Sequence, residues 1–248
     1  MENENQTQEP RVSQEESSKQ SSQKISTPIA IVIAGLLIMI GVIVSGGAKD
    51  TKDKTLSEQV GVSKAKLTEC IGKTDQNALA QKLQTSVESA MKAIPQEQRG
   101  TPYAVIVGNN GVKTEIRGAD SVDSVKKLIT EVTSGTVTAK YEGEVPPVDA
   151  TDHVMGNPST ATVTIIEYSD FECPYCKAFQ ATLKQVVTES NGSVAWVYRH
   201  WPIHSGSFEK LVAAECVAQI KGNDAFWKYS DLLFGLLQTT NNTATEKL

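Results

Sequence analysis

The pair Cys173 and Cys176, in the stretch "DFECPYCKAF", carries the clearest chemistry of the chain. A thiolate rather than a thiol attacks disulfides, so a redox cysteine needs neighbours that stabilise negative charge. An apolar strand pattern at 163–168 precedes the pair and a helical pattern follows it. Cys173 is therefore expected in the first turn of a helix, where free N–H groups and the helix dipole act on its sulfur and Pro174 fits well. We expect Cys173 to be the exposed nucleophile and Cys176 the shielded resolving thiol.

Two other interpretations of this pair are weaker. Structural zinc usually needs four ligands, typically two such pairs, and the chain has one; His153, His200 and His204 show no ligand-like spacing with it. A purely structural role in the core suits a lone cysteine better than a Cys-Pro-Tyr-Cys motif at a strand-to-helix junction. We therefore favour a redox dithiol and predict no metal and no cofactor.

Two acidic residues lie near the pair. Glu167 interrupts the apolar strand "VTIIEYS", where a carboxylate is costly to bury. Strand alternation could turn it to solvent; if it points inward, it lies under the dithiol and could exchange a proton with Cys176. Glu172, next to the nucleophile, is expected to be exposed, and its charge would disfavour the thiolate slightly.

Thr101 and Pro102 directly precede an apolar strand that should be central. Proline removes one donor from the sheet, so this dipeptide could be an ordinary strand start. A cis peptide bond would instead leave a free backbone edge beside the cysteines.

Hydrophobic periodicity predicts an α/β fold. The pattern indicates a helix ending at Pro95, a hairpin with an Asn110-Gly111 turn, a helix capped by Asp120, a β-α-β unit and two further helices. The predicted strands are 103–107, 112–116, 163–168 and 194–199. Neither the first nor the second pair of strands should be stable alone. Joined, they predict one mixed four-stranded sheet with helices on its faces.

The N-terminal region differs in composition from the rest of the chain. Residues 1–27 are polar and predict a disordered tail. Residues 28–48 carry no charge and predict one transmembrane helix, with a cleavable signal peptide as the alternative. A linker at 49–55 follows. Flanking charges do not decide the orientation, but cysteine chemistry favours a C-terminal part outside the cytoplasm.

Composition argues against two classes of protein, nucleic-acid binders and disulfide-rich scaffolds. The formal net charge is −5, and no cluster of Lys and Arg with interleaved aromatics is present, so nucleic acid is excluded as a partner. Four cysteines are too few for a disulfide scaffold. They suit one reactive pair and one structural pair.

The stretches "VTIIEYSDFECPYCKAF", "WVYRHWPI" and "NDAFWKYSDLLF" resemble the first half of DsbA-like thiol-disulfide oxidoreductases of the thioredoxin superfamily. "VSKAKLTECI" and "RGTPYAVIVGNNGVKTEIRGADSVDSVKKLI" resemble the second half, so the halves stand in reverse order. We interpret this as a circularly permuted thioredoxin fold with an inserted helical subdomain; a fragment of a tandem array is the alternative. The expected segments are the second half (56–138), a connector (139–160), the first half (161–240) and a tail (241–248).

The resemblance also implies roles and partners. It implies these site residues: nucleophile Cys173, resolving Cys176, buried acid Glu167, and substrate contacts at Thr101, Pro102, Pro174 and Tyr175. Members of this family oxidise the thiols of exported proteins and are recharged by a quinone-linked membrane oxidase of DsbB or VKOR type. The chain is thus expected to be a single-pass protein of the cell membrane, with an extracytoplasmic catalytic domain.

Cys70 and Cys216 fall on two helices of the inserted subdomain once the halves are reassembled. We expect them to form a structural disulfide; two separate buried thiols are the alternative. The expected function is disulfide formation through Cys173 and Cys176. Disulfide reduction or isomerisation, a cytoplasmic glutaredoxin-type role, and a non-catalytic peptide-binding module are the competing functions.

Overall fold

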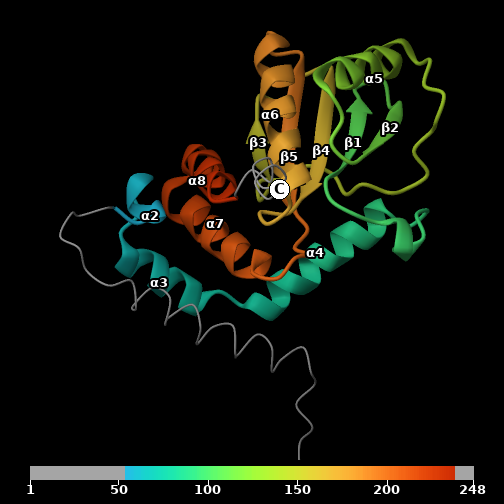
Figure 1. The fold of residues 1–248 in the computed structure, drawn as a ribbon. Coiled ribbons are helices and arrows are strands. Elements are labelled where there is room, and N and C mark those ends of the chain that lie inside the picture. Colours follow the sequence, from blue (N-terminus) through green and yellow to red (C-terminus); the bar gives the residue numbers. More distant parts are fainter. Residues whose placement is uncertain (1–53, 238–248) are drawn as a thin grey trace, which may run out of the picture. The chain divides into compact units, whose positions relative to one another are not determined.

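The computed structural model describes residues 54–237, shown as a ribbon in Figure 1. The predicted tail at 1–27, the predicted span at 28–48, most of the linker and the tail at 241–248 lie outside the described residues. None of the helices within 54–237 has the length and apolar composition that crossing a bilayer requires.

The described residues form one mixed five-stranded sheet, with the order β2-β1-β4-β5-β3. The strands are β1 (Tyr103–Gly108), β2 (Lys113–Arg117), β3 (His153–Met155), β4 (Val163–Ser169) and β5 (Val194–His200). Strands β4 and β5 are parallel, and the other pairs are antiparallel. The predicted count of four strands is wrong, because β3 lies within the expected connector and pairs with the edge of β5.

The predicted hairpin is confirmed. Gly111 has a φ of +82°, a conformation that glycine adopts without strain, and its N–H donates to the Gly108 carbonyl. The Asn110 side chain accepts a hydrogen bond from the Val112 N–H (3.0 Å) and donates to the Val132 carbonyl (2.9 Å). The turn residue therefore also ties the hairpin to the helix that follows it.

The helices follow the predicted order, with two short additions before the sheet. They are α2 (Leu56–Gln59), α3 (Lys64–Lys73), α4 (Gln76–Ala90), the 3-10 turn η1 (Gln96–Gln98), α5 (Val122–Ser134), α6 (Pro174–Glu189), α7 (Ser207–Lys221) and α8 (Asn223–Gly235). The N-cap of α5 is Ser121, whose hydroxyl accepts from the Ser124 N–H, and not Asp120 as the sequence suggested. Serine caps as well as aspartate does, so the shift by one residue changes little.

Both faces of the sheet are covered. On one face, side chains from α5, α6, α7 and α8 pack with Ile165 and Trp196. On the other, Val87 of α4 and Met91 at its C-cap pack with Ile166 and the strands beside it. Because adjacent residues of β4 point to opposite faces, Glu167 shares the face of Ile165 and so points toward α6.

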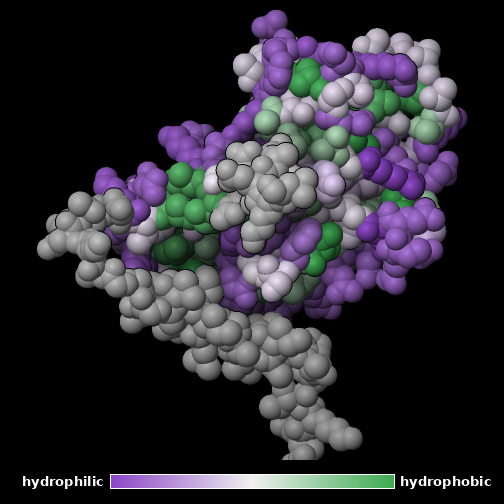
Figure 2. Space-filling model, in the orientation of Figure 1, coloured by the Kyte–Doolittle hydropathy of each residue, from purple (hydrophilic) through white to green (hydrophobic). Residues whose placement is uncertain are grey.

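The helices α2, α3, α7 and α8 form a layer beside the sheet (Figure 1). A disulfide joins Cys70 of α3 to Cys216 of α7, as the sequence predicted. Hydrophobic side chains gather on the face that Figure 2 shows where α2 and α8 meet, and Leu56 and Val60 are among those packed there against the core.

Candidate active site

Cys173 is the N-cap of α6, directly after the turn that follows β4. Pro174 occupies the first turn of the helix, where its missing N–H costs nothing. No side chain caps this helix end, so its N–H groups face the Cys173 sulfur. The placement of the cysteine at the opening of a helix is confirmed.

The two thiols have opposite acidities. The pKa of Cys173 is lowered to about 5, first by hydrogen bonding from the Cys176 thiol and then by Thr101 and by the N–H groups of Cys176 and Tyr175, which together outweigh burial. The pKa of Cys176 is raised, chiefly by burial and by its hydrogen bond to Cys173, with the negative charge of Glu167 adding to the effect. At neutral pH, Cys173 is therefore a thiolate and Cys176 a thiol.

The exposure of Cys173 differs from the expectation. Both sulfur-bearing residues are free cysteines and buried, and Cys173 is only 2 % exposed. The Thr101 carbonyl oxygen lies 3.4 Å from the sulfur and accepts a hydrogen bond from it when Cys173 is protonated. A partner thiol must therefore approach along the exposed Pro174 and Tyr175, of which Tyr175 is 67 % exposed.

The peptide bond between Thr101 and Pro102 is cis. The hydrogen bond from Cys173 to the Thr101 carbonyl places this loop beside the dithiol, although 72 residues of sequence separate the two. Pro102 is buried, and its carbonyl accepts from the Gly118 N–H at 2.9 Å. The structure thus brings Thr101 to Cys173, and Pro102 is the next residue of the same loop.

Glu167 points inward and is fully buried. One carboxylate oxygen accepts a hydrogen bond from the Trp196 indole at 3.0 Å, and the other has no partner among the described residues. Burial raises the pKa of Glu167 to about 8, although the Trp196 hydrogen bond acts in the opposite direction. Most Glu167 side chains are therefore protonated at neutral pH, and the negative charge that raises the pKa of Cys176 appears as the pH rises through about 8.

Asp170 is a site residue that the sequence analysis missed. Its buried carboxylate accepts hydrogen bonds from the backbone N–H groups of Glu172 (2.7 Å), Ile203 (2.7 Å) and His204 (2.9 Å), and from the Ser207 hydroxyl. Burial alone would raise the pKa of Asp170, but these hydrogen bonds lower it overall. The carboxylate holds the turn before Cys173 against the loop that leads into α7. A carboxylate at the end of a strand, immediately before the motif, was the available signal.

Glu172 is half-buried rather than exposed, because its carboxylate pairs with Lys210 of α7 at 2.6 Å. The partner cation offsets the negative charge that the sequence analysis placed beside the nucleophile. The penalty expected for the Cys173 thiolate is reduced accordingly.

Comparisons with known proteins match part of the chain. A family model described as thioredoxin matches residues 149–247. The Na(+)/H(+) antiporter NhaA 1 of Salinispora arenicola is 40% identical over 88 residues, which are 35% of this chain and 13% of that protein. The NhaA 1 antiporter of Mycolicibacterium gilvum is 35% identical over 92 residues, 36% of this chain and 14% of that protein. The match therefore spans only a small part of these relatives.

Two solved structures are also similar. Pseudomonas aeruginosa DsbA2 is 33% identical with a TM-score of 0.33, over 36% of this chain and 50% of that one. BdbD from Bacillus subtilis is 23% identical with a TM-score of 0.33, over 39% of this chain and 54% of that one. The family match thus identifies residues 149–247 as similar to thioredoxin, and the described part of this range carries the Cys-Pro-Tyr-Cys pair and three strands of the mixed α/β sheet, β3, β4 and β5.

Proposed function

We propose that this chain is a membrane-anchored, extracytoplasmic thiol-disulfide oxidoreductase that forms disulfides in exported proteins. The observation that carries the proposal is the asymmetry of the cysteine pair: a Cys173 pKa of about 5 at a helix N-terminus, beside a Cys176 whose pKa is raised. A stabilised Cys173 thiolate favours the reduced pair. Its disulfide is therefore oxidising.

The reaction runs in two exchanges. A substrate thiolate bonds to the Cys173 sulfur of the disulfide, the bond to Cys176 breaks, and Cys176 leaves as a thiolate. Protonated Glu167 supplies a proton to that thiolate. A second substrate thiolate then attacks the substrate sulfur of the mixed disulfide, and Cys173 leaves as a stable thiolate. The substrate loses two electrons and the enzyme pair gains them.

Thr101, Pro102, Pro174 and Tyr175 are assigned to substrate contact. The Thr101 carbonyl oxygen lies 3.4 Å from the Cys173 sulfur, so an extended substrate would meet the same loop at the reacting sulfur. The exposed Pro174 and Tyr175 offer the adjoining surface. A quinone-linked membrane oxidase of DsbB or VKOR type would reoxidise the pair, with residues 28–48 holding the chain at the membrane.

A circular permutation accounts for the order of the segments. Strand β1, from the earlier segment, pairs with β4 of the later one over six residue pairs, from Tyr103 with Tyr168 to Gly108 with Val163. The later segment supplies the parallel strands and the cysteine pair, and the earlier one supplies the cis-proline hairpin. This complementarity within one chain supports permutation over a tandem fragment.

The direction of electron flow is tested by equilibrating the full chain with glutathione. We expect a reduction potential of about −120 to −180 mV, the range of disulfide-forming enzymes. A potential near −270 mV, typical of cytosolic reductants, would contradict the oxidant assignment.

Two variants separate an enzyme from a peptide-binding module. Cys173→Ser should abolish dithiol oxidation and insulin reduction. Cys176→Ser should instead accumulate mixed disulfides when offered a disulfide-bonded substrate, because the Cys173 thiolate displaces one substrate thiolate and no Cys176 thiol is present to release the other. Equal peptide binding by both variants, with neither forming a mixed disulfide, would favour the module.

A further inference from the structure

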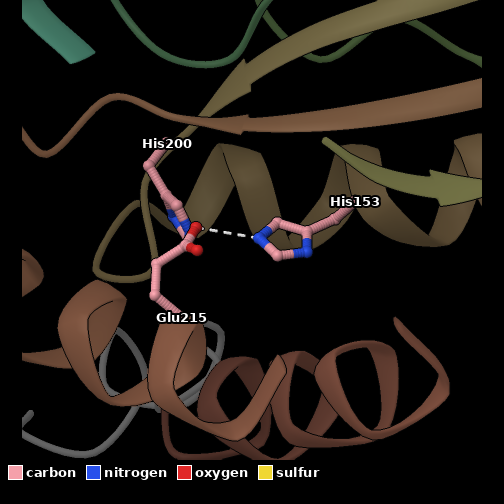
Figure 3. A group of neighbouring side chains, drawn as sticks. All are labelled: His153, His200 and Glu215. Carbon is pink, nitrogen blue, oxygen red and sulfur yellow. Dashed lines mark hydrogen bonds and ion pairs between the residues drawn. The ribbon is translucent and has the colours of Figure 1, made fainter. Parts of the chain in front are cut away.

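His153, His200 and Glu215 converge from three elements far apart in sequence: β3, the end of β5 and the middle of α7 (Figure 3). Their side chains point toward one another, and one nitrogen or oxygen of each lies within 4.8 Å of the others. His153 Nε2 is 2.8 Å and His200 Nε2 is 3.0 Å from the same oxygen, Glu215 Oε1. Two ring nitrogens therefore face one carboxylate oxygen.

Only one of these two contacts is a hydrogen bond. His153 makes it, whereas His200 Nε2 is buried and has no hydrogen-bond partner among the described residues. His200 is only 3 % exposed, so a ring nitrogen that lies 3.0 Å from Glu215 Oε1 without making a hydrogen bond is costly there. Its nitrogen nevertheless points at the other two polar groups. A ligand that bonds to all three atoms would satisfy it.

We propose that these three side chains bind one zinc-class transition-metal ion. Imidazole nitrogens together with a carboxylate oxygen suit zinc, whereas calcium and magnesium prefer oxygen ligands alone. Zinc bonds of about 2.0–2.1 Å place tetrahedral ligands about 3.4 Å apart, slightly more than the present separations. Glu215 can supply the difference, because its side chain is 31 % exposed and is carried on a flexible stem.

The two rings are held in place by aromatic neighbours. His153 stacks on Phe226 with ring centres 3.5 Å apart and planes within 7°. His200 meets Phe171 and Tyr198 edge-on, with ring centres 5.4 and 5.1 Å away. Rings fixed in this way lose little freedom when a metal binds, which favours binding.

The three residues line a cavity of about 600 Å³, which gives an ion a route to them and leaves room for a water molecule as the fourth ligand. Two positively charged side chains also line the cavity, and each already has a polar partner. Arg199 pairs with Asp152 at 2.8 Å, and Lys82 donates to the Thr151 hydroxyl at 2.8 Å. The pair at Cys173 and Cys176 takes no part in this site, so the proposal is independent of the redox function.

Equilibrium dialysis of the full chain against zinc, without a histidine tag, tests the site. The protein is first oxidised to the Cys173–Cys176 disulfide, so that neither sulfur can bind metal. We expect one zinc per chain, with magnesium unable to compete. Glu215→Gln and His153→Gln should each lower the affinity by more than about 100-fold, above the 10–100-fold typical of outer-shell partners.

His204→Gln is the matched control, since His204 is the third and last histidine of the chain. It should leave zinc affinity unchanged. Binding that His204→Gln removes, binding that survives both other variants, or no stoichiometric binding by the wild type would each overturn the site.

X-ray absorption on zinc-loaded wild type keeps the test independent of how the variants fold. The expected first shell contains nitrogen and oxygen with imidazole scattering from two histidines. A shell with sulfur, or one of water alone, would overturn the proposal. Zinc should also raise the Tm of the wild type and not that of Glu215→Gln.

Discussion

Cys173 and Cys176 are chemically identical residues three positions apart, and their surroundings separate their pKa values. A hydrogen bond from Cys176 lowers the pKa of Cys173 most, and Thr101 and two backbone N–H groups lower it further. Cys176 is fully buried, donates to its partner and lies near Glu167. The first sulfur is therefore stabilised as an anion, and the second is held as a neutral thiol.

The acidity of Cys173 sets the pH profile of its alkylation. Iodoacetamide reacts with the thiolate, so the rate should reach half of its maximum near pH 5, compared with about 8.5 for an ordinary cysteine. Mass spectrometry of the labelled peptide, over a pH series, measures this midpoint. Cys176→Ala removes the leading hydrogen-bond donor and should move the midpoint upward. An unshifted midpoint in that variant would contradict the assigned cause.

Glu167 should make the stability of the reduced domain fall with pH. Its folded pKa of about 8 lies above the unfolded value of about 4.5, so its contribution is fully present below pH 4.5 and is lost as pH rises through 8. Between low and high pH the wild type should lose free energy of unfolding on the order of a few kcal/mol, because one pKa unit corresponds to about 1.36 kcal/mol. Glu167→Gln should remove this loss. Urea unfolding at pH 5 and pH 8 measures it. Parallel pH dependence in the two proteins would show that Glu167 titrates normally.

At the scale of elements, the turn between β4 and α6 is held by contacts from distant sequence. The Asp170 carboxylate accepts hydrogen bonds from the backbone N–H groups of residues 203 and 204. It also accepts one from the hydroxyl of Ser207, at the start of α7. The helix that carries Cys173 and the helix that carries Cys216 are thus joined by one carboxylate. The position of the nucleophile depends on this junction.

Asp170→Asn should destabilise the domain by about 1.5–3 kcal/mol, the value of a hydrogen bond to a charged group. The folded pKa of Asp170 lies below the unfolded value of 3.8, so its contribution is present above pH 3.8 and is lost as pH falls through the lowered value. The difference between variant and wild type should therefore shrink in acid, as measured by denaturant unfolding. Asp123→Asn, at an exposed aspartate of α5, is the matched control and should be nearly neutral. An equal loss in both variants would contradict the role of Asp170.

The sequence predicted those parts whose signal is local. The hairpin with its Asn-Gly turn, the β-α-β unit and the helix opening at Cys173 follow from periodicity and from residues that favour turns. Strand β3 was missed because it has only three residues, between prolines and a glycine, which is too short to show an alternation of apolar and polar side chains. The burial of Cys173, the contacts of Asp170 and the meeting of His153 with Glu215 depend on tertiary packing, so no local pattern could reveal them.

At the scale of the whole molecule, the two segments complete one sheet. Strand β4 lies in the centre, between β1 from the earlier segment and β5 from its own. Without β1 it becomes an edge strand with unpaired backbone groups and an uncovered apolar face. The cis-proline loop and the cysteine pair also come from different segments, so the candidate active site requires both.

Residues 161–240 made alone should therefore lack cooperative unfolding, because they lose β1 and the packing of α4 and α5. Thermal unfolding followed by circular dichroism measures this. Coexpression with residues 54–160 is the matched control and should restore a single transition. A cooperative transition for residues 161–240 alone would contradict the interdependence of the segments.

The bond between Cys70 and Cys216 has a consequence for how the protein is made. Closing it removes two electrons and two protons from the chain, and the 146 positions that separate the cysteines must first be synthesised. Cys70 therefore leaves the ribosome long before its partner exists, while Cys173 and Cys176 emerge in between as competing thiols. Correct maturation then depends on an external electron acceptor, so a protein proposed to donate disulfides must first receive one.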